Sequence, residues 1–150
     1  MGYGNPLRRD DGAGWRVAEA VAQRWGDRVT VLMGQQPVPE WAASLAAADV
    51  AFVVDASRRD GDRPRIRRLR PPTEAEPGRS PHQFGPEYLL WLSQTIYGSA
   101  PVTYVLPLPA EDLDFGEGLS PGTTRAADRA IRLLDRRLRV ILRCTSANSG

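Results

Sequence analysis

One segment organises this sequence: Gly2-Tyr-Gly-Asn-Pro-Leu-Arg-Arg-Asp-Asp-Gly-Ala-Gly14, which contains four glycines, an Asn-Pro pair and two adjacent aspartates. Glycine permits unusual backbone angles and lets another part of the chain or a ligand approach closely. Asn-Pro favours a turn. Asp10 and Asp11 stand where the N-cap of a helix is expected. The segment therefore predicts a tight loop that presents carboxylates at the start of a helix.

Three interpretations of this loop compete. Gly2-x-Gly4 begins like a dinucleotide-binding fingerprint, but Leu7 occupies the third glycine position and the aspartates would face a pyrophosphate. The second interpretation is a helix cap with no further role. In the third, Asp11 supplies a carboxylate to a functional site. The rest of the chain has to decide between the last two.

Composition indicates an ordinary globular protein. A length of 150 residues predicts one domain covering residues 1–150, and 41% hydrophobic with 25% charged residues is typical of a folded domain. The net charge of only +2 gives no reason to expect nucleic acid or an acidic membrane as a partner. The single Cys144 excludes an internal disulfide and a cysteine-based metal site. Without a signal peptide or an apolar run of about 20 residues, we expect a cytoplasmic protein.

Helical and strand patterns alternate after the glycine segment. Apolar residues at helical spacing predict helices over 13–25, from Glu40 to about Ala48, over 86–97 and from Pro121 onward. Runs rich in β-branched residues predict strands at 29–33, 50–54 and 102–108, the last broken by Pro107, and 65–67 predicts an exposed edge strand. The alternation predicts a three-layer α/β sandwich, a mostly parallel twisted sheet with helices on both faces. The glycine loop should follow a strand, but Met1 leaves no room for one. We therefore expect the first strand to be missing, either because it lies upstream of the given start or because the sheet lacks a member.

Asp55 follows the continuous apolar run Val50–Val54 directly. Ligands of open α/β sheets sit outside the carboxyl ends of the strands. An ionised carboxylate at the end of a buried strand is costly unless it is paired, hydrogen-bonded or bound to a metal. The alternative role for Asp55 is to cap the turn that follows.

His82 is the only histidine, and it lies in a turn before the helix that begins at Pro86. Neutral imidazole is a common metal ligand. Because a doubly wound domain brings such loops to one rim of the sheet, Asp11, Asp55 and His82 could meet there. Two carboxylates and one imidazole suit Ni, Zn, Mn or Fe. Spacing alone does not distinguish this set from acids that happen to lie near a histidine.

Three segments add to this argument: residues 2–14, Val-Val-Asp-Ala at 53–56 and Ser-Pro-His-Gln at 80–83. They resemble the signature segments of the hydrogenase maturation proteases, the endopeptidases that trim the C-terminus of the nickel-iron hydrogenase large subunit. The stretches 92–98 and 109–121 continue in the same order and resemble the branch that serves bidirectional, NAD-coupled hydrogenases. The similarity covers nearly the whole chain.

The resemblance implies a function and a ligand set. The function is removal of the C-terminal peptide from a nickel-loaded large-subunit precursor, which would be the partner. Asp11, Asp55 and His82 would bind metal, with Asp11 and Asp55 also catalytic, and Asp10 is the runner-up for the first ligand position. The metal would be the nickel already inserted in the precursor, with another divalent metal in the site otherwise. Three further residues resemble a segment that contacts substrate: Gln35, Gln36 and Glu40.

Two mechanisms are compatible with this ligand set. A metal can polarise the scissile carbonyl and activate water. Alternatively, nickel serves as the recognition tag while Asp11 or Asp55 positions a water. The sequence contains neither an H-E-x-x-H helix nor a nucleophile elbow, so zincin and serine-protease routes have no support. Two other functions stay open: a non-catalytic, nickel-recognising assembly factor, and an unrelated small α/β metal-binding hydrolase. We expect a monomer.

Overall fold

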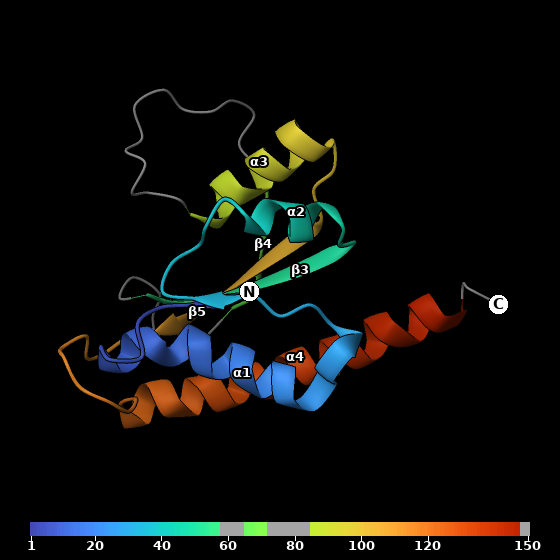
Figure 1. Ribbon diagram of the computed structural model, residues 1–150. Coiled ribbons are helices and arrows are strands. Elements are labelled where there is room, and N and C mark those ends of the chain that lie inside the picture. The colour runs from blue at the N-terminus through green and yellow to red at the C-terminus, as the bar shows by residue number, and fades with distance from the viewer. Residues whose placement is uncertain (58–64, 72–84, 148–150) are drawn as a thin grey trace.

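The computed structural model describes residues 1–57, 65–71 and 85–147. Within these ranges the chain forms three layers, with one sheet between two layers of helices (Figure 1). The strands are β1 (Gly2–Tyr3), β2 (Met33–Gly34), β3 (Val50–Ser57), β4 (Arg67–Leu69) and β5 (Val102–Pro109). The helices are α1 (Ala13–Trp25), α2 (Trp41–Ala46), α3 (Pro86–Tyr97) and α4 (Pro121–Ala147), with short 3-10 turns η1 (Arg9–Gly12) and η2 (Gly26–Arg28) at the two ends of α1. The predicted three-layer α/β sandwich is confirmed.

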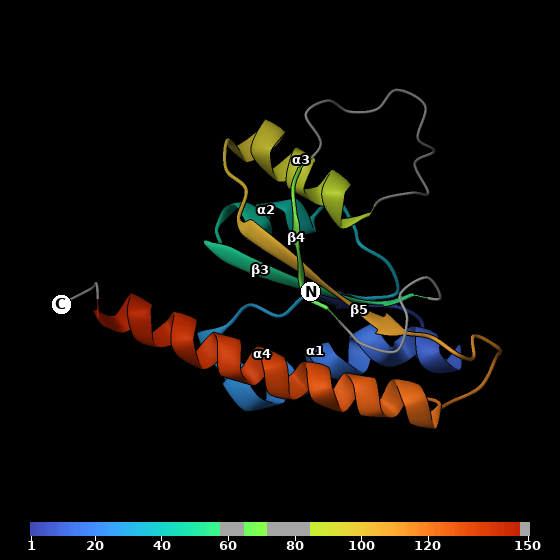
Figure 2. The same cartoon turned by 180° about the vertical axis from the view of Figure 1, so that it is seen from behind.

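The sheet has the strand order β2-β1-β3-β5-β4. Its centre is the long pair of β3 and β5, which run parallel and stay in register from Val50 opposite Val102 to Ser57 opposite Pro109. β1 and β2 are also parallel to this pair, whereas β4 runs antiparallel to β5. Seen from both sides, α1 and α4 cover one face of the sheet, and α2 and α3 cover the other (Figure 2).

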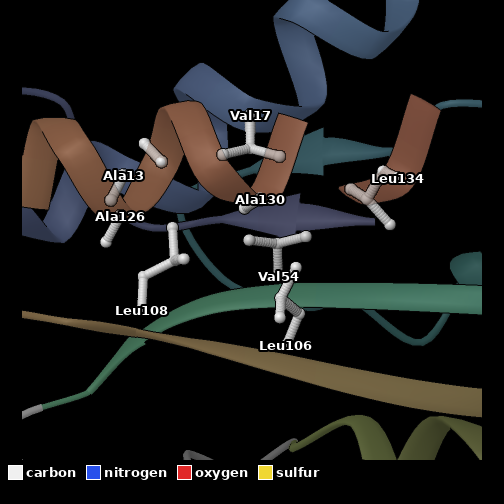
Figure 3. Packing of buried hydrophobic residues seen from close by; sticks show 9 residues of the cluster. Ala13, Val17, Val54, Leu106, Leu108, Ala126, Ala130 and Leu134 are labelled. Atoms are coloured by element: carbon white, nitrogen blue, oxygen red, sulfur yellow. The ribbon is translucent and has the colours of Figure 1, made fainter. Parts of the chain in front are cut away.

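Each face of the sheet has its own apolar core. Toward α1 and α4, Val54 and Leu106 pack against small helix residues (Figure 3), namely Ala13, Val17, Ala126 and Ala130. Toward α2 and α3, Val53 and Val105 pack with Leu45, Leu89 and Leu90. Successive strand residues point to opposite faces. Because both faces are covered, the run at 50–54 is apolar at every position, as expected for a buried parallel strand.

Two salt bridges connect α1 and α4, the helices that cover one face of the sheet. Arg16 of α1 donates to Asp128 of α4 at 2.9 Å, and Arg24 pairs with Asp135 at 2.5 Å. α4 spans 27 residues and its C-terminal end runs out past the sheet (Figure 1). In the part of the chain that the structure describes, no helix combines the length and apolar composition needed to cross a bilayer.

The expected absence of the first strand is wrong. Gly2 and Tyr3 form β1 in the middle of the sheet, where Gly2 pairs with Met33 of β2 and with Val54 of β3. The Met1 ammonium continues this ladder by donating to the Phe52 carbonyl at 2.6 Å. The strand therefore comes from the glycine segment itself, which supplies both a short strand and the loop after it.

Other strands also differ from their predicted extent. β3 continues past the predicted 50–54 to Ser57, so Asp55 lies within the strand and not directly after it. The strand expected at 29–33 is reduced to Met33–Gly34, because the two-residue β1 gives it so short a neighbour. The edge strand expected at 65–67 is β4, at 67–69, with Arg67 and Arg68 exposed and Leu69 buried. Its place at the sheet edge, with arginines in water, agrees with the prediction.

Pro107 does not break β5. The amide of Val102 donates to Asp49 and the amide of Ala110 donates to Ser57, so even-numbered amides of this segment point toward β3. Odd-numbered residues point their nitrogens toward β4. The pairing of β4 with β5 ends at Arg67 opposite Val105. The N–H that Pro107 lacks is therefore one that this ladder does not use.

Close contact between α1 and two strands fixes the glycine loop in place. A Cβ atom on Gly14 would lie 2.5 Å from the Tyr3 carbonyl oxygen and 2.6 Å from that of Val54. Both neighbours are backbone atoms of the sheet, so they cannot move aside as a side chain could. Gly14 thus lets the first turn of α1 rest directly on β1 and β3.

We predict that Gly14→Ala destabilises the fold by about 3 kcal/mol, since the added methyl overlaps sheet backbone. Alanine is otherwise the better helix residue, so any loss comes from this contact. Gly122→Ala, in the first turn of α4, is the matched control because its nearest neighbour is the flexible Glu111 side chain. Urea unfolding of both variants measures the difference. Equal midpoints for the two would contradict the prediction.

Candidate active site

The loops after β1, β2 and β5 and the carboxyl end of β3 lie at one rim of the sheet, because these strands run parallel. Asp11 lies on this rim in η1, within the loop after β1. Asp55 lies near the carboxyl end of β3, opposite Pro107 of β5. The rim of an open α/β sheet is the usual place for ligands.

Asp11 is held by the turn that precedes it. Its Oδ2 accepts a hydrogen bond from the Asn5 amide at 2.8 Å. Gly4 has a φ of 131°, which only glycine adopts readily, and a Cβ atom there would collide with the Asp11 carbonyl. Gly4 and Asn5 therefore fold the loop back under Asp11 and orient its half-buried carboxylate.

The environment of Asp55 makes its carboxyl group a weaker acid. Burial raises its pKa to about 6, a hydrogen bond from Tyr3 opposes that rise, and the charge of Asp11 adds to it. Asp11 lies in η1, which contacts β3, so the two carboxylates belong to neighbouring elements at the rim. A half-buried acid with a charged neighbour at a strand end is typical of functional sites.

Tyr3 is a site residue that the sequence did not reveal. Its side chain is nearly buried and hydrogen-bonds to Asp55, and burial, followed by the charge of Asp55, raises the pKa of the phenol. In β1 its side chain points away from α1, toward the core that contains Leu89 and Leu90. The sequence feature that could have identified Tyr3 is its position between Gly2 and Gly4. At both glycines another part of the backbone approaches closely.

Asp10 has a structural role. It is fully buried, and its carboxylate accepts backbone N–H bonds from Glu111 at 2.8 Å, Asp112 at 2.9 Å and Ser120 at 2.6 Å. Burial alone would raise its pKa, but these hydrogen bonds hold the pKa below its usual range. Its oxygens are thus engaged by the loop after β5, so Asp11 and not Asp10 presents its carboxylate at the rim.

Further contacts join the loop after β5 to the loop after β1. The Arg9 amide donates to the Gly116 carbonyl at 3.0 Å, and the Gly116 amide donates to Leu7 at 2.9 Å. The Arg8 guanidinium donates to the Leu113 carbonyl at 3.2–3.3 Å. Residues 110–120 therefore brace the segment that carries Asp11.

The other predicted site residues are placed only in part. Gln35, Gln36 and Glu40 are exposed in the loop after β2, on the same rim as Asp11. Their contact with substrate stays a prediction. His82 lies outside the described residues, and within the described ranges no group of three His, Cys, Asp or Glu side chains could hold a metal ion.

The two described carboxylates nevertheless fit a divalent cation. Burial and the charge of Asp11 both raise the free energy of the charged form of Asp55. A cation between them would neutralise this repulsion and compensate the lost hydration. Carboxylate oxygens, with an imidazole as the third donor, suit a borderline metal such as nickel or zinc.

We predict that Asp10→Ala destabilises the protein by about 3 kcal/mol at pH 7, because three backbone amides lose a charged, buried acceptor. A carboxyl with a depressed pKa stabilises the fold above its unfolded pKa, and this contribution is lost as pH falls through the folded value. The difference in the free energy of unfolding between wild type and variant should therefore decrease below about pH 4. Asp114→Ala, on the exposed part of the same loop, should stay within about 0.5 kcal/mol of wild type in urea unfolding.

We predict that Asp55→Asn, unlike Asp10→Ala, stabilises the metal-free protein at pH 7. A carboxyl with a raised pKa stabilises the fold below its unfolded pKa of about 4, and this contribution is lost as pH rises through the folded value of about 6. The free energy of unfolding of the variant should equal that of wild type near pH 4 and be about 2 kcal/mol higher at pH 7. Urea unfolding with a chelator at both pH values measures this. A variant less stable than wild type at pH 7 would refute it.

Comparison with known proteins identifies solved structures with a similar fold. No protein-family model matches the sequence, and no curated protein matches it. The hydrogenase maturating endopeptidase HybD from E. coli is 27% identical, with a TM-score of 0.70 over 92% of this chain and 89% of that one. An endopeptidase from Escherichia coli solved in solution is 26% identical, with a TM-score of 0.67 and the same coverage.

A more distant structure has the same fold. The [NiFe] hydrogenase maturation protease HycI from Thermococcus kodakarensis KOD1 is 21% identical, with a TM-score of 0.70 over 92% of this chain and 89% of that one. The structural neighbours are thus hydrogenase maturation endopeptidases, as the resemblance of residues 2–14, 53–56 and 80–83 implies. The chain has the α/β fold of these endopeptidases.

Proposed function

We propose that this protein is an endopeptidase that removes the C-terminal peptide of a nickel-loaded nickel-iron hydrogenase large-subunit precursor. The observation that carries the proposal is the meeting of Asp11 and Asp55 at the rim of the sheet. It occurs in a fold shared with HybD from E. coli at 27% identity over 92% of the chain. The reaction class is hydrolysis of a peptide bond.

Nickel enters this reaction as part of the substrate. Asp11, Asp55 and His82 are the three residues that would contact the nickel of the precursor, and another divalent metal would use the same donors in its absence. A divalent ion bound there supplies Lewis acidity toward a carbonyl oxygen. A precursor without nickel lacks this contact, so the same residues would select the loaded substrate.

The remaining chemistry belongs to the side chains of this chain. Asp55, with a pKa of about 6, can hold or release a proton near neutral pH, which suits it to accept a proton from an attacking water. Tyr3 donates a hydrogen bond to Asp55 and so fixes the direction of its carboxylate. Asp11 is fixed independently by the Asn5 amide. Both carboxylates are thereby oriented before substrate binds.

Substrate contacts and partner follow from the same rim. Gln35, Gln36 and Glu40 are exposed beside the site and would contact the C-terminal segment of the precursor. We assign the partner hydrogenase to the bidirectional, NAD-coupled type on the sequence of residues 92–98 and 109–121 alone. The protein would act as a cytoplasmic monomer, with no nucleic acid or membrane partner.

The test is the intact mass of a purified large-subunit precursor before and after incubation with this protein. We expect loss of a C-terminal peptide from the nickel-loaded precursor and no change in the nickel-free one. Asp11→Ala, Asp55→Ala and His82→Ala should each reduce the cleavage rate at least about 100-fold, since each removes a group that contacts nickel or water. Asp114→Ala, on the same rim but outside the site, is the matched control.

The outcomes separate the alternative functions. A stable complex with nickel-loaded precursor, left uncut after prolonged incubation, would replace the endopeptidase with a non-catalytic assembly factor. Cleavage of unrelated peptides would favour a general metal-dependent hydrolase. Equal cleavage of nickel-free precursor would remove nickel recognition from the proposal while leaving the peptidase activity.

A further inference from the structure

A row of arginines runs along one face of α4. Each of them is exposed, and they recur at alternating intervals of four and three residues. Because a helix turns about 100° per residue, this alternation keeps all of them within about 40° of one line along the helix. At about 1.5 Å of rise per residue, the line spans about 27 Å. We call this set the arginine stripe: Arg125, Arg129, Arg132, Arg136, Arg139 and Arg143.

The arginine stripe lies opposite the face of α4 that packs on the sheet. That face consists of buried small and aliphatic residues, namely Ala126, Ala127, Ala130 and Leu134. With α1, α4 forms one outer layer of the molecule, so the stripe faces solvent (Figure 2). Packing on the sheet fixes the helix in place. The arginines therefore project from a surface that is already formed before any partner binds.

The charge of the arginine stripe is mostly unpaired within the described part of the chain. Of its members, only Arg139 is in a salt bridge there, with Asp135 of the same helix at 3.0 Å. The acidic residues of α4 are Asp128 and Asp135, and they lie beside the stripe, where they pair with Arg16 and Arg24 of α1. Because the whole chain has a net charge of only +2, the stripe concentrates positive charge on one face.

Two kinds of occupant do not fit this face. A helix that binds a bilayer surface inserts its apolar side, but the apolar side of α4 packs on the sheet. Among the described side chains of α4, Val140 is the only large hydrophobic one that is exposed. A second copy of the chain, placed stripe against stripe, would bring like charges together. The occupant has to supply negative charge along a line.

We propose that the arginine stripe is a docking surface for an acidic α-helix of a partner protein. Residues that alternate at four and three positions form the contact line between two helices packed side by side. A partner helix with carboxylates at the same alternation stays opposite the arginines along the whole stripe. In an extended strand, side chains of one face recur about every 6.7 Å, out of register with a mean arginine spacing of about 5.4 Å.

Duplex nucleic acid fits the arginine stripe less well than an acidic helix does. A helix in the major groove lies between two sugar-phosphate walls. On one side of α4, the neighbouring helix α1 occupies the space that one wall would need. Asp128 and Asp135 lie along that same side, where they would face phosphates. A single row of carboxylates avoids both conflicts.

The test uses the full chain and a fluorescein-labelled helical peptide of alanine and glutamine, with glutamates at the same alternation of four and three residues. The control is a peptide of the same composition whose glutamates are distributed around the helix. By fluorescence anisotropy in about 0.1 M salt, we expect the striped peptide to bind at least about 10-fold more tightly than the control peptide. Only the striped peptide aligns all of its carboxylates with the arginines.

Two adjacent arginines provide matched single variants. Arg136 belongs to the arginine stripe, whereas Arg137 is equally exposed but lies about 100° around the helix from it. We expect Arg136→Glu to weaken binding of the striped peptide about 5-fold, because it replaces an attraction by a repulsion. Arg137→Glu changes the net charge by the same amount and should weaken binding by less than about 2-fold.

Double variants test the same point with a larger effect. Arg129→Glu combined with Arg132→Glu should weaken binding of the striped peptide about 25-fold. Arg67→Glu combined with Arg68→Glu, at exposed positions of the edge strand β4, should leave it nearly unchanged. Since all four positions are exposed, the fold should be retained, and urea unfolding of each variant checks this.

Each outcome decides the proposal. Preference for the striped peptide that is lost in Arg129→Glu/Arg132→Glu and kept in Arg67→Glu/Arg68→Glu supports it. Equal binding of both peptides, or equal loss in both double variants, would reduce the interaction to net charge and overturn it. Tighter binding of a short DNA duplex or of phosphatidylserine vesicles through the same arginines would replace the acidic helix with that partner. No cleavage is measured, so the result does not depend on the proposed endopeptidase activity.

Discussion

The structure depends on the direct contact between the first turn of α1 and the backbones of β1 and β3. Gly14 makes this contact possible, since any side chain there would meet the carbonyl oxygens of Tyr3 and Val54. The contact sets the position of η1, and with it the distance between Asp11 at the helix start and Asp55 at the strand end. Close approach of backbones, made by glycines, therefore positions a charged site that no side-chain packing could hold as rigidly.

Two adjacent aspartates and one distant one show how burial can have opposite consequences. Asp10 is buried with three backbone donors, so its charge stabilises the fold and ties the loop at 110–120 to the glycine segment. Asp55 is partly buried beside another carboxylate, so its charge opposes folding. An unfavourable contribution to folding stability of this kind is typical of sites that need a reactive group or a cation. The stabilising carboxylate of Asp10 supports the loop, and the destabilising carboxylate of Asp55 lies at the rim of the sheet.

β1 is a two-residue strand between β2 and β3. Its two residues complete the rim by carrying Tyr3 toward Asp55 and by leading into Gly4 and Asn5. The rim end of this strand is thus positioned by hydrogen bonds and glycine contacts. At its opposite end, residues 29–32 and 50–52 line a cavity.

The sequence by itself determined the features that depend on local spacing. The periodicity of residues 13–25 and 86–97 predicted α1 and α3 at their observed bounds, and the apolar run at 50–54 predicted the buried strand β3, which continues through Asp55 to Ser57. Only the tertiary structure decided which of Asp10 and Asp11 reaches the rim, that Gly2 and Tyr3 form a strand, and that Pro107 sits within β5. These outcomes depend on which backbone group lies opposite each residue. That partner belongs to a segment far away in the chain, so the local sequence does not predict it.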